Sequence, residues 1–328
     1  MSYELRTIHQ PTRQSIEKLA LIYPDNPFFT YNYSQARKMN GDTPVLFEYL
    51  QDGKLINGFI AFENRGVLNR RIEIPSFPPI VGDDAFWEYF INVLMKNRFN
   101  YVHLGSYGSP EQLLIPEVPE ITEKRERCEY LLDLSSEMSS AKISSSHKRN
   151  IKKARSTGIA VRQSGNEDAC LKHLELMDAS MERRNERGEK VQNYIVRGLS
   201  ALIRTGAGRI HQATFENAVL SSIFILEADK GIYYHSAGTS KEGMSVGASH
   251  YLIYSVADHY GKQGKWLFNL GGASRGQTGL ERFKKGFGAR AINLVSFDMY
   301  LGGYWKKIIT TGVELLRGNG ITRAIRKI

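Results

Sequence analysis

The chain has 328 residues, of which 41% are hydrophobic and 24% are charged, with 30 glycines and 10 prolines. This composition excludes a collagen-like or mainly disordered chain, and the length is sufficient for two domains. The formal net charge of +10 favours an anionic partner such as nucleic acid, a nucleotide-linked substrate or an acidic membrane surface.

The chain carries no pattern of membrane insertion, secretion or metal binding. No stretch has the roughly 18 uninterrupted apolar residues of a membrane-spanning helix, and the first residues lack the apolar run of a signal peptide. Its two cysteines, Cys128 and Cys170, form no C-x-x-C pair, and no histidines cluster at ligand spacing. We therefore expect a cytoplasmic protein without a structural disulfide or a metal.

The N-terminal part of the sequence alternates between helix and strand patterns. Apolar residues at helical spacing predict helices over 14–23 and 86–96, and short apolar runs predict strands over 44–50, 55–62 and 101–104. Asp52 and Gly53 stand between the first two strands and predict a tight hairpin turn.

A charged, proline-containing stretch over 109–129 is predicted to separate two halves, and a short apolar strand after it opens the second. We therefore expect an N-terminal domain over 1–130, a C-terminal domain over 131–300 and a basic C-terminal segment over 301–328. That segment either packs on the first domain or rests on an anionic membrane surface.

A basic helix is predicted next. Between residues 142 and 155 there is no acid, and there are six cations: Lys142, Lys148, Arg149, Lys152, Lys153 and Arg155. Ile143, His147, Ile151 and Ala154 recur at helical spacing and predict one buried face, and Gly158 predicts the helix end. We expect His147 to be packed or capped rather than catalytic. The exposed cations form either a solvated face or an anion-binding surface.

The remaining elements predict a mixed sheet with helices on its faces. A helix is expected over 168–187, strands over 209–214, 218–228 and 231–237, a helix after residue 247 and a strand over 266–272. Gly243 and Gly247 lie in the loop that opens the last helix. They indicate either a phosphate cradle or a tight entry into a packed helix.

A second cluster of charge lies at residues 280–288, where Arg282, Lys284 and Lys285 stand beside two aromatic residues and two glycines. It indicates either an anion site or a helix C-terminus that Gly286 caps. No G-x-S-x-G elbow is present, which disfavours a hydrolase with a serine nucleophile.

Five blocks of sequence, over 144–161, 177–183, 233–238, 268–272 and 279–288, resemble the FemAB-type transferases and their acyltransferase relatives in order and spacing. Residues 26–33 are similar to the opening block of that family. The resemblance implies an α/β (α+β) protein of two tandem GNAT-like domains, each with a mixed, mostly antiparallel sheet flanked by helices.

The activity that the resemblance implies is N-acyl transfer to an amine of a cell-envelope or surface-glycan precursor. The donor would be aminoacyl-tRNA or acyl-coenzyme A, with no tightly bound cofactor. The acceptor would be anionic and linked to a nucleotide or a lipid. Contact with the inner membrane face is one of the two alternatives given above for the C-terminal segment. Alternatives are an acetyl-CoA-dependent GNAT N-acetyltransferase acting on an amino sugar or small amine, and a non-enzymatic RNA-binding module.

The same resemblance assigns roles to residues. Lys284 would hold a substrate phosphate or stabilise the oxyanion, Tyr234 would line the cleft, and His235 is the local candidate base. Arg183, and Lys38 or its neighbour Arg37, would contact the anionic acceptor. Independently of the resemblance, the basic helix offers Arg149 and Lys152 to the acceptor, and the glycine loop with the helix that it opens offers Gly243, Gly247, Ala248 and Ser249 to the donor. Asn269 stands where an aspartate is common in the family, and His103 where bridge-forming members carry an acid followed by proline.

Overall fold

The computed structural model describes residues 3–65, 70–78, 84–109, 118, 120–135, 142–188, 198–273 and 278–302. The N-terminal half, which ends at residue 109, contains the helices α1 (Arg13–Ile22), α2 (Tyr31–Met39) and α3 (Asp84–Lys96) and a short 3-10 helix, η1 (Pro27–Phe29). Its strands are β1 (Tyr3–His9), β2 (Thr43–Gln51), β3 (Lys54–Arg65), β4 (Arg70–Ile74) and β5 (Tyr101–Leu104).

The C-terminal half begins with the long strand β6 (Ile121–Asp133). Its helices are α4 (Ser145–Thr157), α5 (Glu167–Glu186), α6 (Leu199–Arg204), α7 (Lys241–Ser245), α8 (Ala248–Lys262) and α9 (Thr278–Lys285). Its further strands are β7 (Ala160–Ser164), β8 (Gly208–Phe215), β9 (Ala218–Glu227), β10 (Gly231–Thr239), β11 (Leu267–Ala273) and β12 (Arg290–Tyr300).

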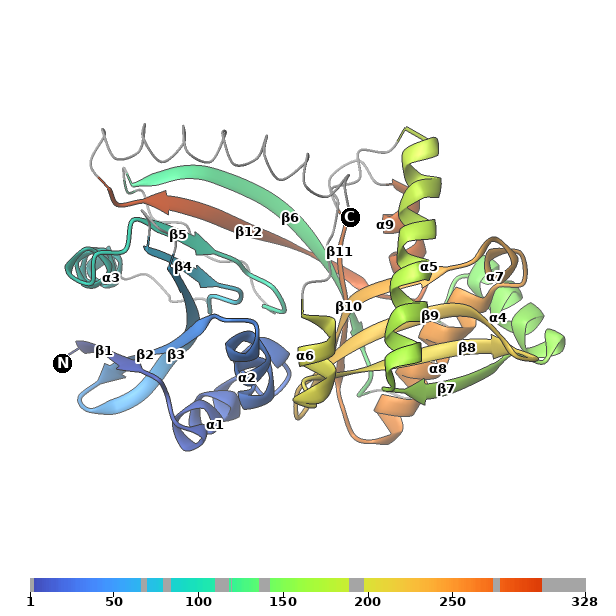
Figure 1. The fold of residues 1–328 in the computed structure, drawn as a ribbon, viewed down its shortest axis with the longest axis horizontal. Coiled ribbons are helices and arrows are strands. Elements are labelled where there is room, and N and C mark those ends of the chain that lie inside the picture. The colour runs from blue at the N-terminus through green and yellow to red at the C-terminus, as the bar shows by residue number, and fades with distance from the viewer. Residues whose placement is uncertain are drawn as a thin grey trace.

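In the described part of the chain, all strands join in one 12-stranded mixed sheet of order β1-β2-β3-β4-β5-β12-β6-β11-β10-β9-β8-β7 (Figure 1). The expected α/β class with a mixed, mostly antiparallel sheet and flanking helices is confirmed. The two halves are not separate sheets, because β12 pairs with β5 on one side and with β6 on the other. The last residues of β6 then pair with β11.

The expected separator over 109–129 is wrong for its second part, because residues 121–129 belong to β6. Most of this segment is exposed and charged, which made it look like a linker in sequence. The domain boundary that the sequence suggests, near residue 130, falls inside this strand. The two halves therefore share one continuous sheet, in which β12 pairs with β5 and with β6.

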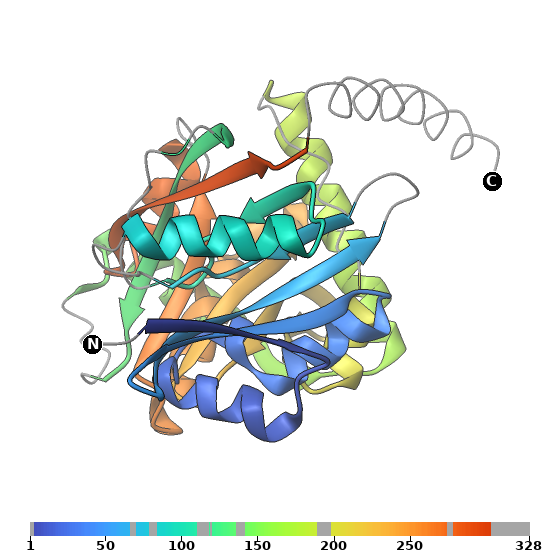
Figure 2. The same cartoon turned by 90° about the vertical axis from the view of Figure 1, so that its left-hand side faces the viewer.

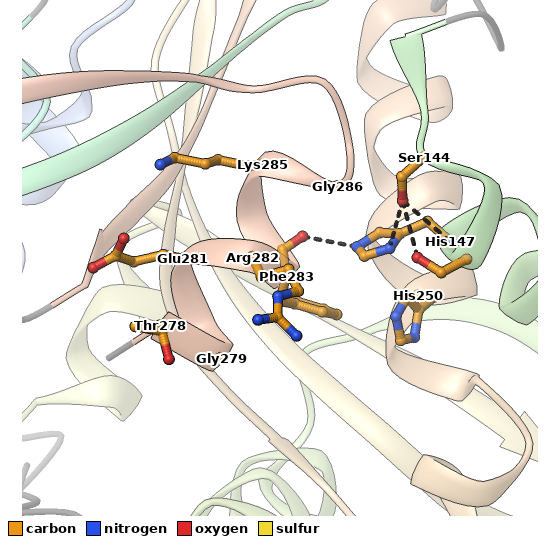
Figure 3. Close-up of a pocket in the computed structure, with 11 residues that line it drawn as sticks. Ser144, His147, His250, Thr278, Gly279, Glu281, Arg282, Phe283, Lys285 and Gly286 are labelled. Carbon is orange, nitrogen blue, oxygen red and sulfur yellow. Dashed lines mark hydrogen bonds between the residues drawn. The ribbon is translucent and has the colours of Figure 1, made fainter. Parts of the chain in front are cut away.

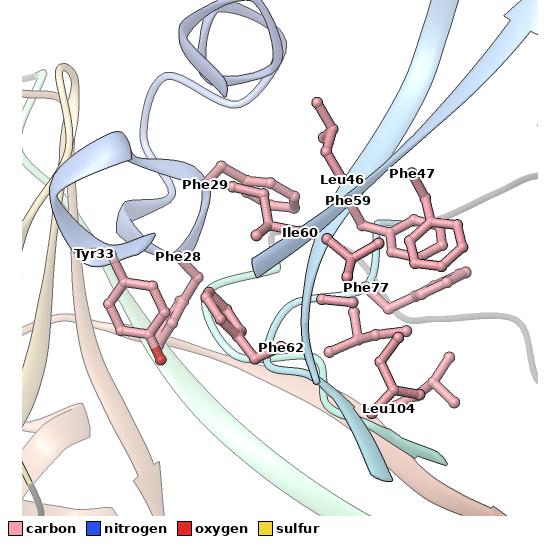
Figure 4. Close-up of a cluster of buried hydrophobic side chains, with 14 of the residues drawn as sticks. Phe28, Phe29, Tyr33, Leu46, Phe47, Phe59, Ile60, Phe62, Phe77 and Leu104 are labelled. Atoms are coloured by element: carbon pink, nitrogen blue, oxygen red, sulfur yellow. The ribbon is translucent and has the colours of Figure 1, made fainter. Parts of the chain in front are cut away.

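The N-terminal half is built around a core of aromatic side chains (Figure 4). Phe47 and Phe59 stack on the facing strands β2 and β3, and Phe90 of α3 meets both rings edge-on. The hairpin between these strands is confirmed, and its turn residues Asp52 and Gly53 have φ angles of +48° and +76°. Figure 2 faces this half and shows α3 running across its strands.

Helices cover both faces of the sheet in the C-terminal half. Phe224 and Leu226 of β9 pack into the core that α5 and the N-terminal half share, whereas their neighbours Ile223 and Ile225 pack with α8 on the other face. Helix α4 packs against α8. Helices α4 and α8 therefore lie on the face opposite α5 (Figure 1).

Helix α4 has the orientation that its sequence predicts. Its buried residues are His147, Ile151 and Ala154, and its cations are exposed. Gly158 ends the helix in the left-handed conformation, with a φ of +85°. None of the described helices is both long and apolar enough to cross a bilayer.

Helix α5 packs closely against β10 at Gly238. A Cβ atom at Gly238 would lie 2.2 Å from the carbonyl carbon of Leu176 in α5. Because backbone atoms cannot move aside as a flexible side chain can, we expect Gly238→Ala to lower the free energy of unfolding by about 3 kcal/mol. Chemical denaturation measures this change.

Gly261→Ala is the matched control. Its Cβ would meet no atom closer than 3.6 Å, and the residue lies inside α8, where alanine is the better helix former by about 1 kcal/mol. Equal free energies of unfolding for the two variants would contradict the close approach of α5.

Candidate active site

The parallel strands β10 and β11 separate near the centre of the sheet. They pair only over three residues each, ending at Tyr233 and Asn269. Beyond that point β10 is irregular between Tyr234 and Ser236, and β11 is irregular between Asn269 and Gly272. We call this place the β10–β11 opening.

A buried carboxylate lies beside the opening. Glu129 of β6 has no exposed surface. Its Oε1 accepts hydrogen bonds from the Tyr233 hydroxyl, at 2.8 Å, and from the guanidinium of Arg127. Its Oε2 accepts from Asn269 Nδ2 at 2.7 Å and from the backbone amide of Gly108 at 3.1 Å. These donors satisfy the charge that burial would otherwise make unstable.

This carboxylate also connects the two halves of the protein. Gly108 and Tyr107 belong to the N-terminal half, and the guanidinium of Arg127 lies 3.8 Å from the centroid of the Tyr107 ring. Tyr233, from β10, also meets Phe28 of the N-terminal half edge-on, with ring centroids 5.1 Å apart. The opening is therefore held by contacts from both halves.

Asn269 links Glu129 to the irregular part of β11. Its Nδ2 donates to Glu129, and its Oδ1 accepts from the amide of Gly271 at 2.8 Å. The next carbonyl, of Gly272, accepts a hydrogen bond from Lys284 Nζ at 2.5 Å. An aspartate at 269 would present Glu129 with a second carboxylate instead of a donor. The asparagine in this chain thus fits the carboxylate of Glu129.

Lys284 of α9 reaches the opening from the face of the sheet that α4 and α8 cover, because α9 packs into the same core as these helices. Its residue is 4% exposed, and Nζ lies 5.8 Å and 5.5 Å from the ring centroids of Tyr130 and Tyr234. Burial lowers the pKa of Lys284 to about 7, although the charge of Glu129 acts in the opposite direction. Lys284 therefore exchanges a proton near neutral pH.

Tyr234 and His235 follow in β10 and are partly buried. Burial raises the pKa of Tyr234, so its phenol stays protonated at neutral pH and can donate a hydrogen bond. Burial lowers the pKa of His235 to about 4, and its ring packs edge-on against Phe224 with centroids 5.6 Å apart. His235 is therefore a weak base at neutral pH, which argues against the role that the sequence suggested for it.

The expected anion contacts are not gathered at the opening. Arg183 of α5 donates to the carbonyl of Thr239 and, at 2.9 Å, to Ser180 Oγ. Arg149 and Lys152 are exposed on α4, across the sheet from α5. The structure therefore brings Lys284 and Tyr234 together but places the cations of α4 and α5 on opposite faces.

The two candidates on α2 differ in their surroundings. Lys38 is exposed at the C-terminal end of the helix. Its neighbour Arg37 forms ion pairs with Asp42 at 2.6 Å and with Glu73 at 2.8 Å. These two carboxylates already neutralise Arg37, so Lys38 is the better candidate for an anion contact from the N-terminal half.

Gly243 lies within α7 rather than in the loop that the sequence predicts, and Gly247 stands directly before α8. A Cβ at Gly243 would lie 2.4 Å from the carbonyl oxygen of Leu220, and one at Gly247 would lie 2.6 Å from that of Asn150. Gly247 also has a φ of +75°. These contacts explain both glycines without a ligand. Helix α8 nevertheless begins at Ala248 and Ser249 without a side-chain cap, which leaves its first amides suited to an anion.

A pocket of about 610 Å³ is lined by α9 and by the starts of α4 and α8 (Figure 3). Its walls come from the start of α4, the first turn of α8, and α9 with the following glycine: Ser144, Ser146, His147, His250, Thr278, Gly279, Glu281, Arg282, Phe283, Lys285 and Gly286. A Cβ at Gly286 would lie 2.3 Å from the ring of His147. Gly286 therefore allows α9 to pack against α4 beside this pocket.

Sequence reasoning missed Arg127, Glu129 and Tyr233. A signal was present in the alternation of Arg125, Arg127 and Glu129, which places three charged side chains on one side of a strand. No group of three or more histidine, cysteine or acidic side chains that could hold a metal occurs in the described ranges.

Comparison with known proteins agrees with this architecture. Residues 141–285 match the family model described as "Acetyltransferase (GNAT) domain". The fold is GNAT-like. The match covers less than half of the chain, and it supports the expected GNAT-like fold and an acyl-transferring enzyme. No curated protein matches the chain in sequence.

Solved structures similar to this chain extend over both halves. FemX has a TM-score of 0.65 at 12% identity, covering 90% of this chain and 97% of FemX. The C-terminal domain of a putative lysylphosphatidylglycerol synthetase from Agrobacterium fabrum has a TM-score of 0.53 at 14% identity, covering 92% and 96%. A tandem GNAT protein from the clavulanic acid biosynthesis pathway has a TM-score of 0.52 at 10% identity, covering 92% and 99%.

The variant Glu129→Gln measures how much the buried carboxylate contributes to the free energy of unfolding. The variant replaces one acceptor oxygen by an amide nitrogen, which cannot accept the hydrogen bonds that are donated there. It also leaves the charge of Arg127 buried without its partner. We expect the free energy of unfolding to fall by about 3 kcal/mol in chemical denaturation.

Glu123→Gln is the control, since Glu123 pairs with Arg125 two residues away on the same strand but is exposed. We expect its effect to stay within about 0.5 kcal/mol. Similar losses in both variants would show that the buried network has no special weight.

Proposed function

We propose that this protein is a FemAB-like N-acyltransferase that moves an acyl or aminoacyl group onto an amine of a cell-envelope or surface-glycan precursor. The observation that carries the proposal is Lys284, a buried amine beside Tyr234 at the β10–β11 opening of a GNAT-like fold. The order of the sequence blocks supports the FemAB type, and FemX is among the similar structures.

The reaction joins the acceptor nitrogen to the acyl carbonyl carbon and breaks the bond from that carbon to the donor's sulfur or oxygen. The amine loses one proton, which ends on the leaving thiol or hydroxyl. Negative charge develops on the carbonyl oxygen in between. A cation or N–H donor fixed at that oxygen lowers the barrier by roughly 3 kcal/mol.

In the proposed mechanism, cationic Lys284 faces the developing oxyanion. Its hydrogen bond to the carbonyl of Gly272 fixes the amine, and the rings of Tyr130 and Tyr234 exclude water around it. The phenol of Tyr234, protonated at neutral pH, donates a second hydrogen bond to the substrate. The amine loses its proton to water or to the leaving group, because His235 is neutral and weakly basic.

The anionic part of a substrate would meet the exposed cations of α4. Within the described residues, no salt bridge joins these cations to an acidic side chain, and Lys153 instead donates to the carbonyl of Ser245 at 2.8 Å. Cations on one helix that have no acidic partner among the described residues favour a phosphate-bearing partner, whether a nucleotide-linked or lipid-linked acceptor or tRNA.

The charge state of Lys284 gives the proposal a pH dependence. With a pKa lowered to about 7, Lys284 is mostly cationic below this pH and mostly neutral above it. We expect Lys284→Met to lower the transfer rate by roughly tenfold or more at pH 6.5 (about half a unit below that pKa), because a transition-state charge partner is lost. Release of free thiol from acetyl-CoA with glucosamine as acceptor measures the rate.

Lys284→Arg is the matched control, since it stays cationic at every pH tested. The wild type should lose rate above a pH of about 7, and Lys284→Arg should lack this decline. A wild-type rate that instead rises through this pH because of Lys284 would assign it the role of base and overturn the oxyanion role.

The second candidate is acetyl-CoA-dependent N-acetylation of an amino sugar or small amine, which the description of the matching family model favours. The uncapped start of α8, at Ala248 and Ser249, is the place where the donor's phosphates would bind. The two candidates share Lys284 and differ in the donor.

Thermal unfolding in the presence of coenzyme A distinguishes the donors. A ligand at a hundred times its dissociation constant stabilises the folded state by about 2.7 kcal/mol. A clear rise in melting temperature with coenzyme A, and none with adenosine alone, is expected for an acyl-CoA donor. No rise would exclude coenzyme A and leave aminoacyl-tRNA, for which binding that weakens with salt is the expected result.

A further inference from the structure

The pocket beside α9 contains a serine and a histidine at catalytic distance. Ser144, which caps α4, places Oγ 3.1 Å from Nδ1 of His147 (Figure 3). The other ring nitrogen of His147, Nε2, lies 2.8 Å from the backbone carbonyl of Phe283 in α9. Both residues line the pocket.

These contacts determine where the protons lie. A carbonyl oxygen can only accept, so Nε2 of His147 must carry the hydrogen that points at Phe283. Burial lowers the pKa of His147, which makes the ring a weaker base but keeps it neutral, and so able to accept a proton, at neutral pH. Nδ1 of the neutral ring then has a free lone pair to which the Ser144 hydroxyl can donate, while the Ser146 hydroxyl, 3.2 Å from Ser144 Oγ, can donate to Ser144 in turn. A serine whose proton is held by a histidine, itself oriented by a third group, has the geometry of an activated nucleophile.

We propose that Ser144 is a nucleophile and His147 its general base, in a pocket that takes a carboxylic ester or thioester bearing an anionic group. Arg282 and Lys285 line the pocket and provide its cationic side, opposed only partly by Glu281. The first amides of α4, at Ser145 and Ser146, have no carbonyl partner within the helix and would stabilise the charge that develops on the acyl oxygen.

The proposed covalent step needs only Ser144, His147, the substrate and water. Ser144 Oγ bonds to the acyl carbon, and its proton moves to Nδ1 of His147. The bond from the acyl carbon to the leaving oxygen or sulfur breaks, and the proton passes from His147 to that atom. Water then attacks the acyl-serine and gives one proton to His147. The bond from the acyl carbon to Ser144 Oγ breaks, His147 returns the proton to Oγ, and a carboxylic acid leaves.

This inference goes beyond the proposed function and does not depend on it. Lys284 is absent from the pocket lining, and the carbonyl that it binds belongs to Gly272 at the β10–β11 opening. Covalent labelling of Ser144 and transfer to an amine are separate measurements, so either idea can fail while the other stands.

The test uses the full chain and p-nitrophenyl acetate, followed by mass spectrometry of the tryptic peptide over 143–148, which contains Ser144. We expect acetylation of Ser144 and release of p-nitrophenolate. His147→Gln should lower the labelling rate roughly tenfold or more, because an amide in its place can form hydrogen bonds but cannot accept the proton.

Two variants distinguish a role of Ser144 as nucleophile from its role as the helix N-cap. Ser144→Asn keeps a good N-cap but has no hydroxyl, so it should lose the label while its melting temperature stays near that of the wild type. Ser146→Ala, from the same pocket, should keep the label. A label on Ser145, Ser146 or lysines alone, or equal labelling of Ser144 with His147→Gln, would reduce Ser144 to a helix cap and overturn the proposal.

Discussion

The burial of the Glu129 carboxylate is the constraint on which the centre of the molecule depends. A charge without exposed surface is stable only with strong donors, and here they come from β6 itself, from β10, from β11 and from the chain at Gly108. Any shift of one half against the other would remove a donor and leave the charge uncompensated. One acidic side chain thus helps to fix the relative position of the two halves, beside the apolar core that they share.

The same arrangement prepares the environment of Lys284. Asn269 connects the carboxylate to the irregular backbone of β11, and that backbone presents the Gly272 carbonyl to the amine. Two aromatic rings surround the amine, and burial brings its pKa to about 7. The acid and the amine are therefore parts of one network that reaches through the sheet where β10 and β11 separate.

Features with local causes could be predicted from the sequence. The buried face of α4 follows from apolar residues at helical spacing, the hairpin turn from Asp52 and Gly53, and the prominence of Lys284 from its motif. The Glu129 network could not be predicted, because Tyr233 and Asn269 are 104 and 140 residues away from it in sequence. The charged first part of β6 also looked like a linker, since exposed polar side chains hide the period of a strand. Such positions acquire meaning only when distant strands become neighbours.

The place of β12 has a consequence for how the protein folds during synthesis. This strand comes at the end of the described chain, yet it lies between β5 and β6 and pairs with both. As the chain leaves the ribosome, β5 and β6 emerge long before their shared neighbour and present unpaired backbone edges. Completion of the N-terminal core, to which Phe297 and Met299 contribute, must await residues 290–300. Folding is therefore governed by a late, long-range closure, and nascent chains that stall before this strand would be open to edge-to-edge aggregation.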